Sequence, residues 1–266
     1  MTDSRITLSD GRTLAYAEYG VSDGVPIVFH HGTPGSRLLA ILLDAAARKA
    51  DVRVIAPDRP GFGLSDSDPG RTIEDWPTDV SALMDSLSIN RFGTVGFSGG
   101  GPFALACAAN CSRAASIGLI SALVPGADGG MLGTLARRTP VVLRAGLRIS
   151  ARFAQLRPGI VVQQYTSREV SSEVAEVAAQ DFQEAFRQGA HATVHESRLF
   201  AESSSVLLPE IPAIIRHGAQ DGNAPIAPVR ALADRESADF QLLPEDHFGT
   251  FLDAHSDVLD SVASVL

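Results

Sequence analysis

Hydrophobic and polar positions in the first third of the chain predict strands and helices in regular alternation. Residues 6–19 alternate around an Asp-Gly dipeptide, which predicts two strands joined by a tight turn. Apolar runs over residues 26–31 and 52–56 predict buried strands, and the Ala/Leu-rich segment 38–50 predicts an amphipathic helix between them. This order is typical of a parallel sheet covered by helices on both faces.

The same order continues, stops and then resumes. A helix is expected to open at Thr72, with strands at residues 92–97 and 116–121 on either side of a further helix. From about residue 124 to residue 208 the pattern is helical and shows no clear strand. Further strands at 212–217 and 239–243 and a final helix over 251–266 complete the predicted order. We therefore expect a core domain made of residues 1–123 and 209–266, with residues 124–208 as a helical insertion.

Composition narrows the class of protein. The 266 residues are 45% hydrophobic, enough for a substantial core, and the formal net charge of −9 argues against binding to nucleic acid. The sequence contains no apolar run of about 18 residues, the length that a membrane-spanning helix needs, so no membrane insertion is expected. The N-terminal residues do not resemble a secretory signal, which favours a cytoplasmic location. Cys107 and Cys111 have too few neighbouring ligand residues for a metal site and are expected to be small buried residues.

One motif indicates chemistry. The segment Gly96-Phe97-Ser98-Gly99-Gly100 follows a predicted strand and precedes a predicted helix, and it fits the G-x-S-x-G pattern of a nucleophile elbow. Residues 96 and 100 of such a turn approach each other too closely to carry side chains. A plain Gly/Ser turn without chemistry is the alternative. A dinucleotide-binding loop is excluded because this segment lacks the glycines that such a loop needs.

A serine nucleophile needs a base and a group that orients the base. Asp221 and His247 each follow a predicted strand in the chain order expected after a nucleophile elbow, so all three groups would meet at the carboxyl edge of the sheet. Asp128 is an alternative carboxylate, and Asp246, the neighbour of His247, is expected to point away. We predict Ser98, Asp221 and His247 as the catalytic residues.

Acyl transfer also needs hydrogen-bond donors for the oxyanion. Elbow geometry makes the backbone N–H of Gly99 one donor. The loop after the strand at residues 26–31 is expected to supply the other, and within it we choose the backbone N–H of Thr33.

Together these segments resemble the α/β-hydrolase superfamily. The resemblance is carried by the loops at residues 30–35 and 58–65, by the elbow, and by Asp221 and His247. It implies an α/β-hydrolase fold with an eight-stranded, mostly parallel sheet, helices on both faces, and a helical cap formed by the insertion. It also implies that Ser98 is the nucleophile and that Thr33 and Gly99 form the oxyanion hole.

The resemblance leaves the substrate open. We favour a serine hydrolase that cleaves a carboxylic ester or lactone through an acyl-enzyme, with a small acyl compound as its partner and no cofactor or metal. Proline iminopeptidases, carbon–carbon bond hydrolases and cofactor-free perhydrolases share the triad. The chain departs from proline iminopeptidases at Thr33, where they usually have Gly, and at Gly99, where they have Trp. An aminopeptidase would also need carboxylates that face the substrate amine, for which Glu169, Glu173 and Glu184 are candidates.

A further alternative belongs to another class, a non-catalytic ligand-binding protein that keeps the fold. An intact triad argues against it.

Charge is unevenly distributed in the insertion. Seven arginines and no acidic residue occupy residues 130–168, whereas the part that follows is mainly acidic. Pairing between the two halves or solvated faces is the expected meaning, and recruitment of an anionic substrate is the alternative.

Overall fold

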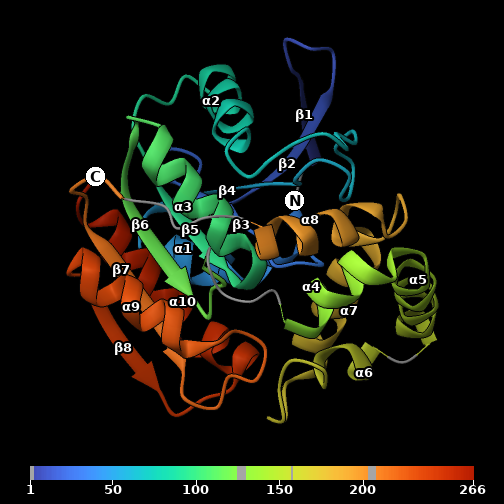
Figure 1. Cartoon of the computed structure of the whole chain (residues 1–266). Helices are drawn as coiled ribbons and strands as arrows, with labels where there is room; N and C mark the ends of the chain where they lie inside the picture. Colours follow the sequence, from blue (N-terminus) through green and yellow to red (C-terminus); the bar gives the residue numbers. More distant parts are fainter. Residues whose placement is uncertain (1–2, 125–129, 157, 203–207) are drawn as a thin grey trace.

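The computed structural model describes residues 3–124, 130–156, 158–202 and 208–266. Its centre is one sheet with the strand order β1-β2-β4-β3-β5-β6-β7-β8 (Figure 1). The first two strands pair antiparallel to each other, β2 also pairs antiparallel to β4, and the remaining pairs are parallel. The strands are β1 Asp3–Thr7, β2 Thr13–Gly20, β3 Val25–His30, β4 Val52–Pro57, β5 Phe92–Phe97, β6 Ala114–Ile120, β7 Ala213–Gly218 and β8 Asp239–Leu243. The predicted eight-stranded, mostly parallel sheet is confirmed.

Helices cover both faces of this sheet, as alternate side chains of β3 show. Ile27 and Phe29 belong to one apolar cluster with α1 and α10, whereas Val28 belongs to another with α2 and α3. The third cluster joins α3 and α9 to β6 and β7. These helices are α1 Asp44–Lys49, α2 Trp76–Ser86, α3 Gly101–Asn110, α9 Ile226–Glu236 and α10 His247–Ala263.

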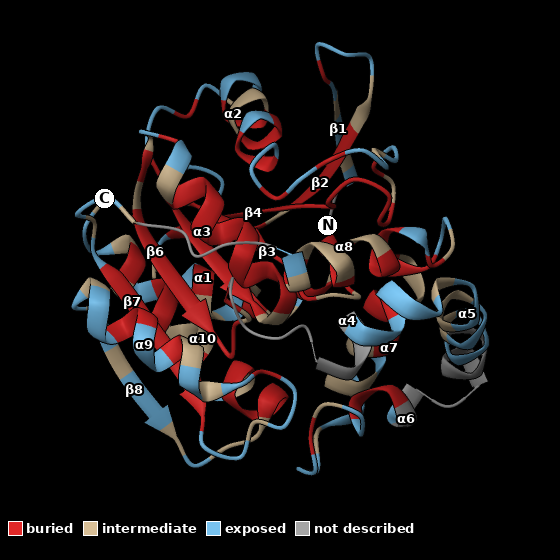
Figure 2. Cartoon of the chain, in the orientation of Figure 1, coloured by how far each residue is buried: buried red, intermediate tan, exposed pale blue. Residues whose placement is uncertain are grey.

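The central strands β3, β4, β5 and β6 are buried over most of their length (Figure 2). Every residue of β5 is buried, which explains why it is a continuous apolar run and not an alternating one. Helix α10 approaches the sheet closely, because a Cβ atom at Gly118 would lie only 2.5 Å from Val258. Val258 of α10 therefore packs directly against β6.

Three helix boundaries differ from the sequence prediction. Residues 38–50 form a 3₁₀ helix, η1 (Arg37–Leu43), followed by α1, and not one α-helix. Helix α2 begins at Trp76 and not at Thr72, since Asp75 accepts hydrogen bonds from the backbone and hydroxyl of Thr72 in the preceding turn. The last helix begins at His247, four residues earlier than expected, because Asp246 caps it through the N–H of Gly249 at 3.0 Å.

In the described residues between β6 and β7, the chain forms five helices. They are α4 Gly130–Arg138, α5 Pro140–Leu156, α6 Pro158–Val162, α7 Ser172–Ala185 and α8 His191–Glu202. Figure 1 shows them gathered to one side of the sheet. Helix α7 packs on η1, and α8 packs against α4. Among the described helices, none is both long enough and apolar enough to cross a membrane.

Candidate active site

The turn after β5 holds Ser98 in the conformation expected of a nucleophile elbow. Its φ is 52°, in the left-handed region that a residue with a side chain seldom adopts. A short 3₁₀ turn, Ser98–Gly100, leads directly into α3. The strained backbone places Ser98 at the carboxyl edge of the sheet, beside the N-terminal end of a helix.

The glycines around Ser98 are required by close packing. A Cβ atom at Gly96 would lie 2.8 Å from the carbonyl oxygen of Gly100 and 2.9 Å from the Cβ atom of Ala104. A Cβ atom at Gly100 would overlap the carbonyl oxygen of His30. The expectation that positions 96 and 100 exclude side chains is confirmed.

Asp221 and His247 meet although 26 residues separate them. Asp221 lies in the turn after β7, where its Oδ1 accepts hydrogen bonds from the backbone N–H groups of Asn223 and Ala224 at 2.8 and 2.9 Å. His247 is the first residue of α10, and its Nδ1 lies 2.8 Å from Oδ2 and 3.0 Å from Oδ1 of Asp221. This contact fixes the ring so that Nε2 is the nitrogen free to act.

The surroundings of the Asp221 carboxylate favour its charged form. Burial by itself would raise the pKa, but the hydrogen bond and charge of His247, with the backbone N–H groups of Ala224 and Asn223, hold the pKa of Asp221 below its usual value. His247 is also buried, and its ring lies 5.1 Å from that of Phe97, centroid to centroid. An ionised carboxylate beside a buried imidazole can stabilise the imidazolium that forms when the base takes a proton.

The loop after β3 lies against the elbow. A Cβ atom at Gly32 would be 3.5 Å from the Cβ atom of Ser98, and a Cβ atom at Gly99 would be 3.0 Å from the backbone nitrogen of Thr33. The backbone of residues 32 and 33, which includes the predicted oxyanion donor of Thr33, therefore lies against Ser98 and Gly99.

A small cavity opens over these groups. Its volume is about 40 Å³, which is room for about three waters. Ser98, His247, Gly32 and Thr33 line it from the core, and mainly apolar side chains complete the wall. The other lining residues are Pro34, Leu39, Phe97, Val161, Tyr165, Ala178, Asp181, Phe182 and Phe248.

The sequence analysis missed Asp181 and Tyr165 as lining residues of this cavity. Asp181, in α7, is buried and its Oδ1 accepts hydrogen bonds from the backbone and hydroxyl of Ser36, each at 2.7 Å. Burial raises the pKa of Asp181 to about 7, and that of Tyr165 to about 12. No sequence signal separates Asp181 from the surface carboxylates of the same helix, apart from its place on the helix face that also carries Ala178 and Phe182.

The other carboxylates considered from the sequence have different positions. Asp128 lies outside the described residues. Asp246 points away from His247, as expected, and binds the hydroxyl of Thr166 and the backbone of Ser167. Glu184 forms an ion pair with Arg37 at 2.8 Å and does not line the cavity.

Cys107 and Cys111 are free and buried, as predicted. Within the described residues, no group of three His, Cys, Asp or Glu side chains is arranged to hold a metal ion.

Comparison with known proteins gives a family and several relatives. The model of the "Alpha/beta hydrolase family" matches residues 27–260. The chain is 37% identical over 129 residues to a non-heme chloroperoxidase of Streptomyces lividans, with 45% of each chain covered. It is 33% identical over 103 residues to a bifunctional esterase/perhydrolase of Acinetobacter calcoaceticus, with 36% of this chain and 35% of that protein covered. These alignments span less than half the length of either relative.

Solved structures resemble the chain over nearly all of its length. The enol-lactonase of Burkholderia xenovorans superimposes with a TM-score of 0.75 at 20% identity, over 98% of this chain and 100% of that one. At this identity the likeness shows the fold alone.

Proposed function

Because the chain belongs to the alpha/beta hydrolase family, we propose that it is a serine hydrolase that cleaves carboxylic esters or lactones through an acyl-enzyme. One observation carries the proposal. The imidazole of His247, hydrogen-bonded to Asp221, lines the same cavity as Ser98, beside the backbone of Thr33. This arrangement supports Ser98 as nucleophile, His247 as base, Asp221 as the carboxylate that orients the base, and Thr33 as one oxyanion donor.

The proposed mechanism uses the same groups in both half-reactions. Nε2 of His247 takes the hydroxyl proton of Ser98 as Oγ attacks the carbonyl carbon, and the N–H groups of Thr33 and Gly99 bind the oxyanion. The imidazolium, stabilised by Asp221, then protonates the leaving alcohol, and an acyl-enzyme remains. Water attacks this ester with His247 again acting as base, and the acid is released.

The cavity supports a short acyl group. Its volume suits a chain of few carbons, and its walls from Leu39, Val161 and Phe182 are apolar. Helices α6 and α7 supply several of these walls, so we propose residues 124–208 as a cap domain that sets substrate size over a core of residues 1–123 and 209–266. The proposed partner is accordingly a small acyl compound.

Hydrolysis of p-nitrophenyl esters of increasing acyl length tests the proposal. The chain should favour acetyl to butyryl esters, and Ser98→Ala should lower kcat by about 10⁴-fold or more. A fluorophosphonate probe should label the parent protein at Ser98 and leave Ser98→Ala unlabelled. A protein that neither hydrolyses any ester or lactone nor takes up the probe would be a binding protein and not an enzyme.

Perhydrolysis is a second candidate activity. Two relatives are named chloroperoxidase and esterase/perhydrolase, and the proposed acyl-enzyme could be attacked by hydrogen peroxide in place of water. His247 would take a proton from hydrogen peroxide as the peroxide oxygen bonds to the acyl carbon, and would pass that proton to Ser98 Oγ as the bond between Oγ and the acyl carbon breaks, so that a peracid leaves and the serine hydroxyl is restored. Peracid formation from acetate and hydrogen peroxide, measured beside ester hydrolysis, gives the ratio of the two activities. Both should disappear in Ser98→Ala, since both need the acyl-enzyme.

A further inference from the structure

We infer that Arg59 and Glu196 are positioning residues for the oxyanion hole, through which a cap helix fixes the backbone of Thr33. The inference rests on the proposed function for its kinetic consequence, while the positioning itself rests on contacts in the structure. Arg59 belongs to the loop after β4, and Glu196 to α8. Both side chains are fully buried, and neither lines the cavity over Ser98.

Arg59 binds three consecutive residues of the loop after β3. Its Nη1 donates to the carbonyl oxygen of His31 at 2.6 Å. Its Nη2 donates to the carbonyl oxygen of Gly32 at 3.0 Å and to Oγ1 of Thr33 at 2.9 Å. Its backbone N–H donates to Nε2 of His31 at 3.3 Å. Burial holds the pKa of His31 well below its usual value, so the neutral ring carries its proton on Nδ1 and donates it to Gly32 O at 2.8 Å.

These bonds set the direction of the proposed oxyanion donor. The peptide bond between Gly32 and Thr33 is trans, so its N–H points opposite to its C=O. Since Arg59 and His31 both hold the carbonyl of Gly32, the N–H of Thr33 is turned away from them. A Cβ atom at Gly99 would lie 3.0 Å from the Thr33 nitrogen, so the elbow occupies the adjoining space. Rotation of this one peptide plane would remove a donor.

Glu196 holds Thr33 and Arg59 from the cap side. Its Oε2 accepts a hydrogen bond from Thr33 Oγ1 at 2.5 Å, and its two oxygens receive Nε and Nη2 of Arg59 at 2.7 and 2.9 Å. Arg71 adds a further bond to Oε1 at 2.6 Å. Burial would raise the pKa of Glu196, but the charges of Arg59 and Arg71 lower it to about 2, so the carboxylate stays ionised at neutral pH.

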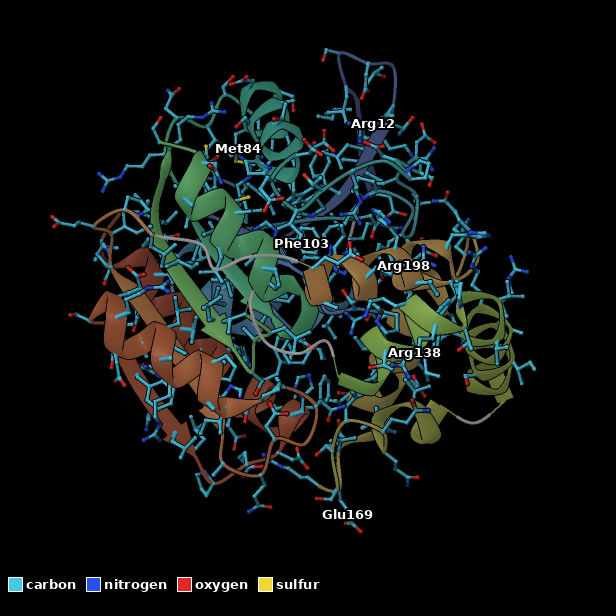
Figure 3. All side chains as sticks on the ribbon, in the orientation of Figure 1. Arg12, Met84, Phe103, Arg138, Glu169 and Arg198 are labelled. Carbon is cyan, nitrogen blue, oxygen red and sulfur yellow. The ribbon has the colours of Figure 1, made fainter. Side chains whose placement is uncertain are left out.

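An aromatic ring also packs against the guanidinium groups of Arg59 and Arg71. Phe103 of α3, labelled in Figure 3, lies under both guanidinium groups, 4.4 Å from Arg59 and 5.3 Å from Arg71. Arg59 is thus fixed between an aromatic face, a carboxylate and two carbonyl oxygens. Such a buried group can hold a backbone plane in one orientation.

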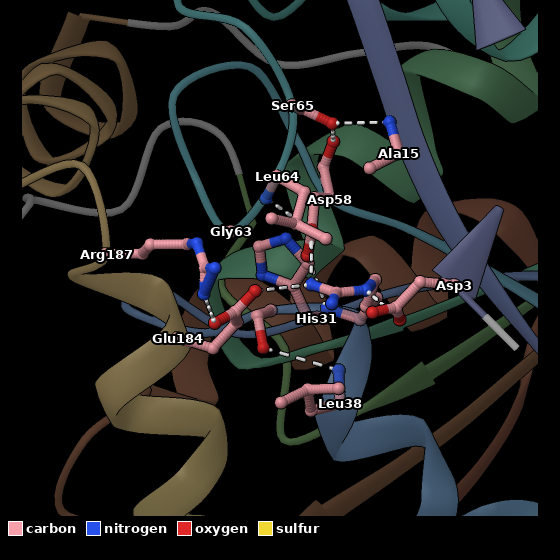
Figure 4. A network of polar contacts seen from close by, with 12 residues as sticks. Asp3, Ala15, His31, Leu38, Asp58, Gly63, Leu64, Ser65, Glu184 and Arg187 are labelled. Atoms are coloured by element: carbon pink, nitrogen blue, oxygen red, sulfur yellow. Dashed lines mark hydrogen bonds and ion pairs between the residues drawn. The ribbon is translucent and has the colours of Figure 1, made fainter. Parts of the chain in front are cut away.

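A second ion pair between the cap and the core provides a matched control. Glu184 of α7 binds Arg37, the first residue of η1, and Arg37 also binds Asp58 and Asp3. Figure 4 labels the three carboxylates of this network, Asp3, Asp58 and Glu184. This network makes contact with the cap but has no bond to the backbone of residues 32 and 33. Glu184→Gln therefore removes a cap–core ion pair without touching the proposed donor.

The kinetic test compares Glu196→Gln with Glu184→Gln on the ester that the parent enzyme hydrolyses best. We expect Glu196→Gln to lower kcat by about 10-fold to 100-fold with KM changed by less than about 2-fold, because the donor acts on the transition state. Glu184→Gln should leave both constants near those of the parent. A change in KM alone, or an equal decrease of kcat in the two variants, would contradict the inference.

A second pair of variants covers the case in which Glu196→Gln fails to fold, since it leaves two buried arginines without a counter-charge. Thr33→Val keeps the shape of the side chain and the Arg59–Glu196 pair but lacks the hydroxyl. Thr33→Val should lower kcat. Thr33→Ser, which keeps the hydroxyl, should have a higher kcat than Thr33→Val. Equal kcat values for these two variants would overturn the role of the Thr33–Glu196 bond.

Crystal structures of the same variants separate failure of this inference from failure of the proposed function. We expect the Thr33 nitrogen to move by more than about 0.5 Å in Glu196→Gln and not in Glu184→Gln. If the parent hydrolyses no ester and takes up no fluorophosphonate, the proposed function is wrong, and the position of this nitrogen still decides whether Glu196 positions it. An unmoved nitrogen together with unchanged kcat overturns the inference.

Discussion

Thr33 and Gly99 compete for one space: a Cβ atom at Gly99 would lie 2.5 Å from Oγ1 and 2.6 Å from Cβ of Thr33. The two positions at which the chain departs from proline iminopeptidases are therefore physically linked. With Thr33 in place, position 99 has no room for a side chain. The Thr33/Gly99 pair keeps the space for a hydroxyl that Glu196 and Arg59 can hold.

Gly99→Ala should displace Thr33 and disable the proposed oxyanion hole. The added methyl group cannot be accommodated, so the loop after β3 must shift, and kcat for ester hydrolysis should fall by about 100-fold or more. Gly146→Ala is the control, because a Cβ atom there meets nothing within 4 Å. Equal activity of the two variants would show that the contact between residues 33 and 99 is unimportant.

Asp221→Asn should leave the fold intact and lower kcat by about 10⁴-fold, because an amide cannot stabilise the imidazolium of His247. Asp246→Asn tests the neighbouring carboxylate, which caps α10 and binds Thr166 but does not contact the imidazole nitrogen. It should retain most of the activity and lose some thermal stability. If Asp246→Asn were the inactive variant, the assignment of the orienting carboxylate would be wrong.

Asp181 should make stability fall as pH rises from about 4 to about 7. Burial raises the pKa of this carboxyl from 3.8 to about 7, with a smaller contribution from the charge of Asp58. The folded state therefore binds a proton that the unfolded chain has released, which costs up to about 1.4 kcal/mol of unfolding free energy per pH unit in this range. Urea unfolding of the parent and of Asp181→Asn across pH 4–8 measures the difference. As pH rises, the unfolding free energy of Asp181→Asn should increase relative to that of the parent. A constant difference between the two proteins across this pH range would contradict the shifted pKa.

Phe182→Ala should extend the range of acyl groups. Phe182 lines the cavity from α7, and its removal opens space for several further carbons. The preferred p-nitrophenyl ester should change from a short acyl chain to a longer one. Phe186, whose ring lies 4.9 Å from that of Phe182, is buried beside it but does not line the cavity. Phe186→Ala should therefore cost stability without changing the chain-length preference.

The core and its edge could be predicted because local patterns determine them. The apolar run that ends at Ser98 and the glycines beside it identify a strand, a tight turn and a helix with no knowledge of the remaining chain. Parallel strands place their carboxyl ends together, so the positions of Asp221 and His247 after two later strands predict that these residues meet, and they do.

The cap could not be predicted to the same depth. Its carboxylates were expected either to pair with the arginines of the insertion or to lie on solvated faces, yet the described bonds of Glu184 and Glu196 run chiefly to Arg37, Arg59 and Arg71 of the core. Glu196 and Arg59 are 137 residues apart, and their pairing depends on how α8 docks. Helical periodicity gives the buried face of α8 but not the residue that this face meets.

The buried pair of Arg59 and Glu196 limits how this protein can be re-engineered. Replacing the helices between β6 and β7 with those of another protein would change the lining of the cavity and remove Glu196. Two arginines would then remain in the recipient without their anion. Chimeras should tolerate such a graft only when the donor segment carries an acidic residue at the equivalent site, or when both arginines are exchanged with it.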